Sequence, residues 1–306
     1  MKKFLIVRIV KAIFTIWFVV TLVFVLTRVS GDPTYWILSD EAPVEVRLEL
    51  RESLGLNRPI HQQYFETFAN VWRGDVGESY YFRRPVNELF AQRAGATLSL
   101  GVTAFVLSVV LGIPLGGFAA VKRNSFSDRF SMSVATVVDA IPGFVFAIIM
   151  IFIFSLKLHW FPSGGSGSLL NYIMPVVTLA VGPMANIARL TRSSLLDVLK
   201  QDYLDCARAK GVLEYKIIYK HALRNALIPV ATIVGLQMGF IISGSVVVET
   251  VFAWPGIGSL LVTAASTRDF PVVQYGVLVI SVAVTLTNAL VDLSYAFLDP
   301  RIRDNF

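Results

Sequence analysis

Six long apolar runs set the first limit on how this 306-residue chain can fold. Each run is long enough for a helix of about 20 residues, the length needed to cross a hydrocarbon core about 30 Å thick. The runs are continuous rather than alternating, which favours membrane-spanning helices over a β-barrel. Their approximate bounds are 9–27, 97–121, 130–156, 172–188, 225–248 and 271–291. The fourth run is expected to continue past Arg189.

The composition supports a membrane protein. Hydrophobic residues make up 55% of the chain and charged residues only 16%, against about 25% charged in soluble domains. The net charge is +6, but the basic residues lie between the apolar runs and are not interleaved with aromatics as in a nucleic-acid site. The single cysteine, Cys206, excludes an internal disulfide and a thiolate metal cluster. The sequence therefore predicts an all-α membrane protein, a polytopic bundle of about six transmembrane helices in contact with lipid, and no nucleic-acid partner.

The distribution of Lys and Arg predicts the orientation. Most of the 27 basic residues share one side of the membrane if the N-terminus is cytoplasmic, and the short connections on the other side hold only Lys157 and Arg268. The first run has no small-x-small cleavage site after it and is interpreted as an uncleaved span. Both termini are therefore expected inside. Residues 29–95 form an outer segment within one permeation domain spanning 1–306, with helices expected over 41–54 and 61–72.

The chain lacks the motifs of an enzyme. It has no glycine-rich phosphate loop ending in Lys-Ser or Lys-Thr, no Gly-x-Ser-x-Gly elbow and no His-Glu-x-x-His. We expect no catalytic residue, no cofactor and no metal site.

The inner connection over 189–225 has a distinctive pattern. Residues 194–209 favour a helix, Gly211 is expected to stop it, and a second helix follows over 213–224 with a basic stripe. Two short helices joined at a glycine form a compact knob that can enter a groove on a partner protein. A positively charged hairpin at the membrane surface, which only fixes topology, would show the same pattern. The residues alone leave both interpretations open.

Family motifs bear on this choice. The segment Asp205-Cys206-Ala207, with Gly211 four positions later, resembles the Glu-Ala-Ala-x-x-x-Gly loop of permease subunits of bacterial ABC importers. The strings Ala-Arg-Ala-Lys-Gly at 207–211 and His-Ala-Leu-Arg-Asn-Ala at 221–226 resemble the dipeptide, oligopeptide and nickel branch. Where the wider family has Ile-x-Leu-Pro, this chain keeps only Leu223. Further matches cover nearly the whole chain, including Gly31-Asp32-Pro33, Gly112-Ile113-Pro114-Leu115-Gly116, Trp254-Pro255-Gly256-Ile257-Gly258 and Asp299-Pro300-Arg301.

The resemblance implies a fold, a role and partners. The fold would be that of a type I ABC importer permease in the bacterial inner membrane. The subunit would form, with a second permease in a heterodimer, the pathway for ATP-driven uptake of peptides or a related small solute. Two cytoplasmic ATPase subunits or domains and a periplasmic substrate-binding protein would complete the system, so the chain itself would not be an enzyme. The residues implied in ATPase coupling are Asp205, Ala207, Ala209, Gly211 and Leu223.

Charged residues inside the apolar runs are further candidates, because an intramembrane charge is costly unless paired or functional. Asp139 precedes Pro142 and Gly143, which can break the third span. It could line the solute pathway and meet a peptide amino terminus, or it could be a hydrogen-bond partner between helices. Glu249 and Asp292 lie nearer the interfaces, where a structural role is favoured.

One more segment has two alternative roles, and two other functions are alternatives to import. The segment 254–258 could help form an outer gate, or its tryptophan could be an aromatic anchor at the interface. An intramembrane enzyme, such as a lipid-modifying transferase, would need paired polar groups at one depth. A proton-coupled carrier usually has more spans and relays of acidic or histidine residues.

Overall fold

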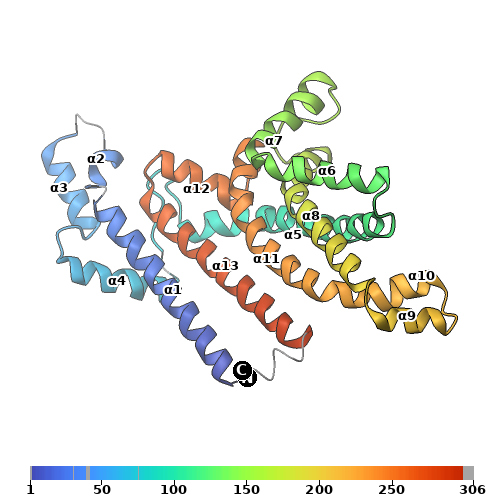
Figure 1. The fold of residues 1–306 in the computed structure, drawn as a ribbon. Coiled ribbons are helices and arrows are strands. Elements are labelled where there is room, and N and C mark those ends of the chain that lie inside the picture. Colours follow the sequence, from blue (N-terminus) through green and yellow to red (C-terminus); the bar gives the residue numbers. More distant parts are fainter. Residues whose placement is uncertain (1, 30, 39–41, 75, 299–306) are drawn as a thin grey trace. The chain divides into compact units, whose positions relative to one another are not determined.

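The computed structural model describes residues 2–29, 31–38, 42–74 and 76–298 (Figure 1). Within these residues the chain forms helices and turns, with one isolated β-bridge between Glu78 and Pro85 and no strand. Five helices are long and apolar enough to cross a membrane, namely Ile9–Val29, Val86–Val121, Leu170–Val198, Glu214–Val251 and Phe270–Ala289. A bent pair, Phe126–Ala140 with Gly143–Lys157, makes a sixth if it counts as one span. The predicted polytopic helical fold is confirmed, and the fourth span continues past Arg189 as expected.

The chain divides into two compact units. The N-terminal unit contains residues 2–96 and 256–285, and the central unit contains residues 97–255 and the described residues from 286 onward.

The N-terminal unit contains the first candidate span and several shorter helices. Its elements are α1 (Lys2–Val29), α2 (Thr34–Ile37), α3 (Val44–Ser53), α4 (Ile60–Arg73), the start of α5 (Val86–Val121), α12 (Ile257–Ser266) and the start of α13 (Phe270–Leu298). The helices predicted over 41–54 and 61–72 are confirmed as α3 and α4. The core joins Phe90 of α5, Leu260 of α12 and Val272 of α13. Asp269, fully buried, accepts hydrogen bonds from the Ser79 hydroxyl and from the backbone N–H of Tyr80, and so holds the loop before α5.

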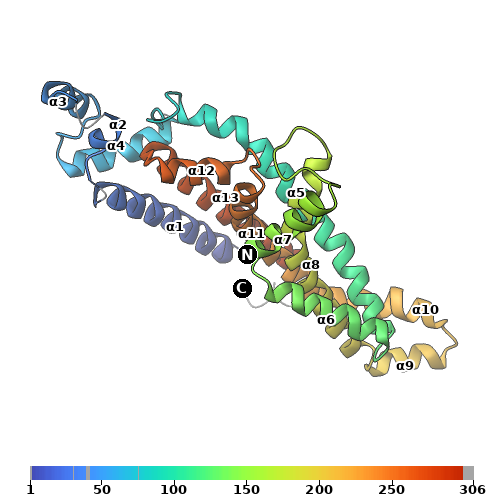
Figure 2. The same cartoon turned by 90° about the horizontal axis from the view of Figure 1, so that it is seen from above.

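The central unit contains the remaining spans. Its elements are the rest of α5, α6 (Phe126–Ala140), α7 (Gly143–Met150), the π-helix η1 (Ile151–Lys157), α8 (Leu170–Val198), α9 (Asp202–Ala209), α10 (Glu214–Lys216), the π-helix η2 (Ile217–Ala222) and α11 (Leu223–Val251). α8 lies alongside α11, and α6 and α7 pack on α8 (Figures 1 and 2). The prediction of a helix over 194–209 is wrong at residues 199–201, because α8 ends at Val198 and α9 begins at Asp202.

Small residues allow α5 to cross α8 closely. A Cβ atom added at Gly116 would lie 2.2 Å from the backbone oxygen of Ala188, and one at Gly112 would lie 3.0 Å from the side chain of Ile187. Glycines one turn apart let two helix backbones approach in a membrane, where packing rather than water exclusion holds helices together. The string 112–116 thus positions α8, the helix that carries most of the candidate site.

Candidate functional site

The third span is interrupted where the sequence predicted a break. α6 ends at Ala140, Ile141 has extended backbone (φ −83°, ψ 124°), and α7 begins after Pro142. The two parts of the span are bent by 106°. Proline has no N–H to donate and disfavours helical backbone at the preceding residue, so a break in the helix is favoured at this point.

A cavity of about 270 Å³ adjoins this break, between α6, α7, α8 and α11. Its wall is mainly apolar, with side chains such as Val138 of α6, Phe144 of α7, Leu179 of α8 and Val247 of α11. Among the described lining residues, Asp139 carries the only charge and Thr178 the only hydroxyl. An apolar wall with a few convergent polar groups is the usual composition of a small-molecule site.

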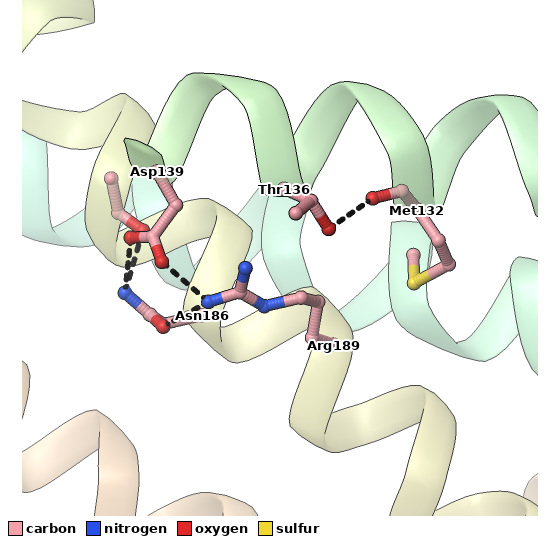
Figure 3. A network of polar contacts seen from close by, with 6 residues as sticks. Met132, Thr136, Asp139, Asn186 and Arg189 are labelled. Atoms are coloured by element: carbon pink, nitrogen blue, oxygen red, sulfur yellow. Dashed lines mark hydrogen bonds and ion pairs between the residues drawn. The ribbon is translucent and has the colours of Figure 1, made fainter. Parts of the chain in front are cut away.

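Asp139 belongs to a polar network that joins α6 to α8. Figure 3 shows Asp139, Asn186 and Arg189 pointing toward one another. Arg189 Nη2 donates to Asp139 Oδ2 at 2.6 Å and to Asn186 Oδ1 at 2.7 Å. Asn186 Nδ2 donates to Asp139 Oδ1 at 3.0 Å and to the carbonyl of Gly182 at 3.2 Å. The side chains of Asp139 and Arg189 are each 33% exposed, so the ion pair remains accessible.

The position of Asp139 explains its need for partners. It lies in the last turn of α6, where the carbonyl ends of the helix carry partial negative charge and disfavour a carboxylate. A lone charge within a membrane span is costly as well. Arg189 compensates both effects by neutralising the charge, and Asn186 fixes the carboxylate in place through its second oxygen.

Two further polar groups of α8 adjoin the cavity. The Thr178 hydroxyl is buried and has no hydrogen-bond partner within the described part of the chain. Pro183 lies inside α8 and has no N–H to give to the carbonyl of Leu179, one turn earlier. Buried polar groups are usually paired, so a buried hydroxyl without a described partner, on a residue that lines a cavity, can serve a polar ligand or water if its side chain turns toward the cavity.

The candidate pathway residues predicted from the sequence come together here. Asp139 and Gly143 line the cavity, and Pro142 makes the break between them. Asp139 is a hydrogen-bond partner between helices, as one of the two interpretations expected, and it also lines the cavity. Its place on a solute pathway stays a prediction. Asn186 and Thr178 were not identified from the sequence, and Arg189 was counted only among the basic residues of the inner connection. The sequence signal for Asn186 and Arg189 is their spacing of three residues, which places them on one face of a helix expected to continue past Arg189.

The other charged and aromatic candidates lie elsewhere. Glu249 of α11 is fully buried and accepts a hydrogen bond from the Thr97 hydroxyl at 2.7 Å. The side chain of Asp292 lies outside the described residues. Trp254 is 4% exposed and packs edge-on against Tyr172, with ring centroids 4.9 Å apart.

The connection after α8 folds as a helical hairpin that ends α9 at a glycine. Gly211 has φ +76°, the left-handed conformation that glycine adopts without strain. Its N–H donates to the carbonyl of Arg208 at 2.9 Å, and the N–H of Val212 donates to the carbonyl of Ala207 at 3.2 Å. This pair of bonds is the Schellman motif of helix C-termini. The helix stop predicted at Gly211 is confirmed, and the second arm (α10 and η2) continues directly into α11.

The hairpin has its own apolar core, defined by Leu195, Val198, Leu204, Ile217, Ala222 and Ala226 together with Ala120 of α5. Of the five residues implied in coupling, Ala207 and Leu223 pack partly against this core. Asp205, Ala209 and Gly211 are exposed. The five therefore separate into two that support the hairpin and three that are available for contact.

Arg208 links the two arms of the hairpin. Its guanidinium contacts Asp205 on α9 at 2.6 Å and Glu214 of α10 at 3.1 Å. Hydrogen bonds to Glu214 and then to Asp205 raise the pKa of Arg208, so it stays charged at any physiological pH. Exposed ion pairs contribute little stability, and the effect of this one is mainly to fix the arms around Gly211.

Family models match nearly the whole chain. Residues 112–304 match the family described as "Binding-protein-dependent transport system inner membrane component". Residues 1–101 match the N-terminal part of such a membrane component.

Individual relatives agree with these matches. The chain is 42% identical over 304 residues to the glutathione transport system permease protein GsiC of Escherichia coli (strain K12), with 99% of each chain covered. The same figures hold for GsiC of Salmonella typhimurium (strain LT2).

Solved structures show a similar fold. An inward-facing form of the MetNI methionine ABC transporter has a TM-score of 0.58 at 20% identity, covering 69% of this chain and 96% of that chain. An amino acid ABC transporter crystallised with histidines has a TM-score of 0.55 at 16% identity, covering 69% and 94%.

Proposed function

This chain belongs to the family of binding-protein-dependent transport system inner membrane components and is the permease subunit of an ABC importer, and we propose that its central unit combines part of the solute pathway with the coupling to the ATPases. Membership places it in the bacterial inner membrane with ATPase and binding-protein partners. Family membership decides against the two alternative functions, an intramembrane enzyme and a proton-coupled carrier.

The finer arrangement is part of the proposal. The subunit pairs with a second permease in a heterodimer, above two cytoplasmic ATPase subunits or domains. Both termini and the coupling loop 189–225 face the cytoplasm, residues 29–95 face the periplasm, and residues 1–306 act as one permease domain. The solute is a peptide or a peptide-like molecule such as glutathione, the solute named for the relatives in Escherichia coli and Salmonella typhimurium.

The path of α8 is the observation that carries the proposal. Asn186 and Arg189 of this helix bond to Asp139 beside the cavity, and Leu195 and Val198, two turns further on, belong to the hairpin core. A movement imposed on the hairpin therefore acts on the same helix that holds the ion pair. Shifts of packed helices are a common means of transmitting such a movement.

The exposed residues of the hairpin favour a protein partner. Leu213, Tyr215 and Tyr219 are each more than half exposed on the second arm, near the small residues Ala209 and Gly211. Exposed aromatic and apolar side chains grouped in this way are typical of a contact surface.

Ala209 gives the sharpest test of the coupling contact. It is exposed at the end of α9, so Ala209→Glu should leave abundance and thermal unfolding of the permease nearly unchanged. A large charge at this point should prevent the ATPases from co-purifying and abolish uptake. Gln201→Glu, an exposed charge of the same sign earlier in the connection, is the matched control and should keep both. Normal ATPase binding and uptake in Ala209→Glu would leave the hairpin as a determinant of topology only.

Gly211 needs a different design because its backbone is left-handed. A Cβ there meets no atom within 4 Å, so there is space, but most side chains would strain the turn. Asparagine tolerates this conformation better than other residues. We expect Gly211→Asn to couple better than Gly211→Glu, because the second change adds both strain and a charge.

Import itself can be measured with the co-encoded ATPases, second permease and binding protein in proteoliposomes. Uptake of radiolabelled glutathione or of radiolabelled dipeptides should require both ATP and the binding protein. Uptake of neither solute would count against the proposed substrate class.

A further inference from the structure

We propose that the cavity beside Asp139 is a transient binding site for a zwitterionic solute, whose ammonium and carboxylate groups replace each partner of the Asp139–Arg189 ion pair. The inference rests on the proposed pathway through the central unit. It adds the chemical class of the solute and the groups that recognise it.

Charge balance is the first argument. The ion pair is neutral, partly exposed and held at 2.6 Å. Its Asp139 end lines the cavity, and Arg189 stands behind Asp139, outside the residues that line the cavity. When a zwitterion enters, its ammonium can bind Asp139 and its carboxylate can bind Arg189. The site then remains neutral, and no charge is left unpaired where burial makes an unpaired charge costly. Asn186 bonds to both partners now, and its amide can remain with either because it both donates and accepts.

The neighbouring groups of α8 fit an amide-bearing solute. The Thr178 hydroxyl has no partner among the described residues but almost no accessible surface, so it can donate to a peptide carbonyl once its side chain turns toward the cavity. The carbonyl of Leu179, which receives no bond from Pro183, can accept from a peptide N–H. The volume of about 270 Å³ lies just under the range of about 300–1,000 Å³ usual for small-molecule pockets and suits a small solute.

The ion pair also gives selectivity without a shaped pocket. A solute whose amine is blocked could still offer a carboxylate to Arg189, but Asp139 would lose its partner and gain none. An unpaired charge of this kind is a means of rejecting the wrong ligand. The site should therefore distinguish a free peptide from its N-acetylated form although the two differ little in size.

A cysteine reporter can test this on the assembled complex without the binding protein, which has its own selectivity. Val247 lines the cavity and is 44% exposed, so Val247→Cys in a Cys206→Ser background should react with a small water-soluble thiol reagent in the nucleotide-free or the ATP-trapped state. Glycylglycine should slow this reaction, and N-acetylglycylglycine should not. Thr250→Cys, exposed on the same helix but outside the cavity wall, is the control and should react at the same rate with either compound.

Second-site variants assign the effect to the proposed groups. Asp139→Asn should remove protection by glycylglycine. Thr178→Val, which leaves the ion pair intact, should raise the half-protecting concentration by about tenfold, as for one lost hydrogen bond to a polar group in a dry site. Because Thr178→Val does not disturb the charges, it stays informative if Asp139→Asn fails to assemble.

Three results would overturn the site: no reaction at Val247→Cys in either state, equal protection by the N-acetylated compound, or full protection in Asp139→Asn and Thr178→Val. None of them bears on ATP-dependent uptake by the wild-type system. Failure of this inference and failure of the proposed function are therefore separate results.

Discussion

At Gly116 the backbone of α5 lies so close to α8 that only hydrogen fits as a side chain. A Cβ there would stand 2.2 Å from the carbonyl oxygen of Ala188, and the obstacle is backbone, which cannot rotate away. Gly116→Ala should therefore force the helices apart and lower the thermal unfolding temperature in detergent, with a cost of about 1–3 kcal/mol as for overpacked cores. Gly117→Ala is the matched control, because its Cβ meets no atom within 4 Å. Similar unfolding of the two variants would show that the close crossing is absent.

The Asp128–Arg192 pair should contribute to stability only as a pair. Arg192 donates to both oxygens of Asp128, at 2.5 and 2.7 Å, and the Asp128 side chain is 2% exposed. Arg192→Gln leaves a buried carboxylate without its counter-charge, a change that typically costs about 3–5 kcal/mol.

The double variant isolates the charge effect. Adding Asp128→Asn to Arg192→Gln should restore most of the abundance and thermal stability, because no buried charge then remains. Arg129→Gln, an exposed change beside Asp128, should have little effect. A double variant no more stable than Arg192→Gln would mean that packing, not charge, dominates.

At the residue scale the sequence was informative about single unusual residues and silent about their partners. Asp139 was identifiable because a carboxylate inside an apolar run is costly unless it is paired or functional. Its partners Asn186 and Arg189 were not, because a contact 47 to 50 positions away depends on how α6 packs on α8. The family resemblance groups Ala207 and Gly211 as coupling residues, and the structure separates them because Ala207 packs partly into the hairpin core.

At the element scale, hydropathy predicted the spans and local backbone chemistry predicted their interruptions. The stop at Gly211 follows from its left-handed backbone, which glycine adopts without strain. Pro142 favours a break, but α5, α8 and α11 each continue through a proline, so local backbone limits alone do not decide the break. The interruption at residues 199–201 contains no glycine or proline, so no local sequence signal predicts it. It depends on Leu195 and Leu204 entering one shared core from two helices.

Pro142 yields a prediction about this third span. The cavity wall uses residues from both sides of the 106° bend, so the bend must persist for the cavity to exist. Pro142→Ala restores an N–H and relieves the restriction on Ile141, which favours a straighter span. We expect unchanged or higher thermal stability but lower ATP-dependent uptake. Pro114→Ala, at an exposed proline inside the continuous helix α5, is the control for replacing a proline and should keep uptake. Full uptake by Pro142→Ala would remove the bend from the mechanism.

At the scale of the whole molecule, the proposed function depends on α8, because this helix reaches both the cavity beside Asp139 and the hairpin core. α8 begins after the loop that follows η1, where Asn171 donates a hydrogen bond to the carbonyl of Gly164, and it ends in the hairpin core at Val198. A helix of 29 residues is about 43 Å long, enough to cross the hydrocarbon core and extend beyond it. The partners of Asp139 in the proposed pathway thus lie on the same helix that ends in the core of the coupling hairpin.

This arrangement requires the hairpin to face the cytoplasm, and the orientation can be measured. Lys and Arg are concentrated in the connections on the hairpin side, and such residues are retained on the cytoplasmic face. Alkaline phosphatase is active only after export, so a fusion after Glu52 in α3 should be active. Fusions after Lys210 and after the last residue should be inactive. Separate fusions to a reporter active only in the cytoplasm should give the opposite pattern at all three points, which controls for poor expression. An active phosphatase after Lys210 would place the hairpin outside, out of reach of any ATPase, and the coupling proposal would fail with it.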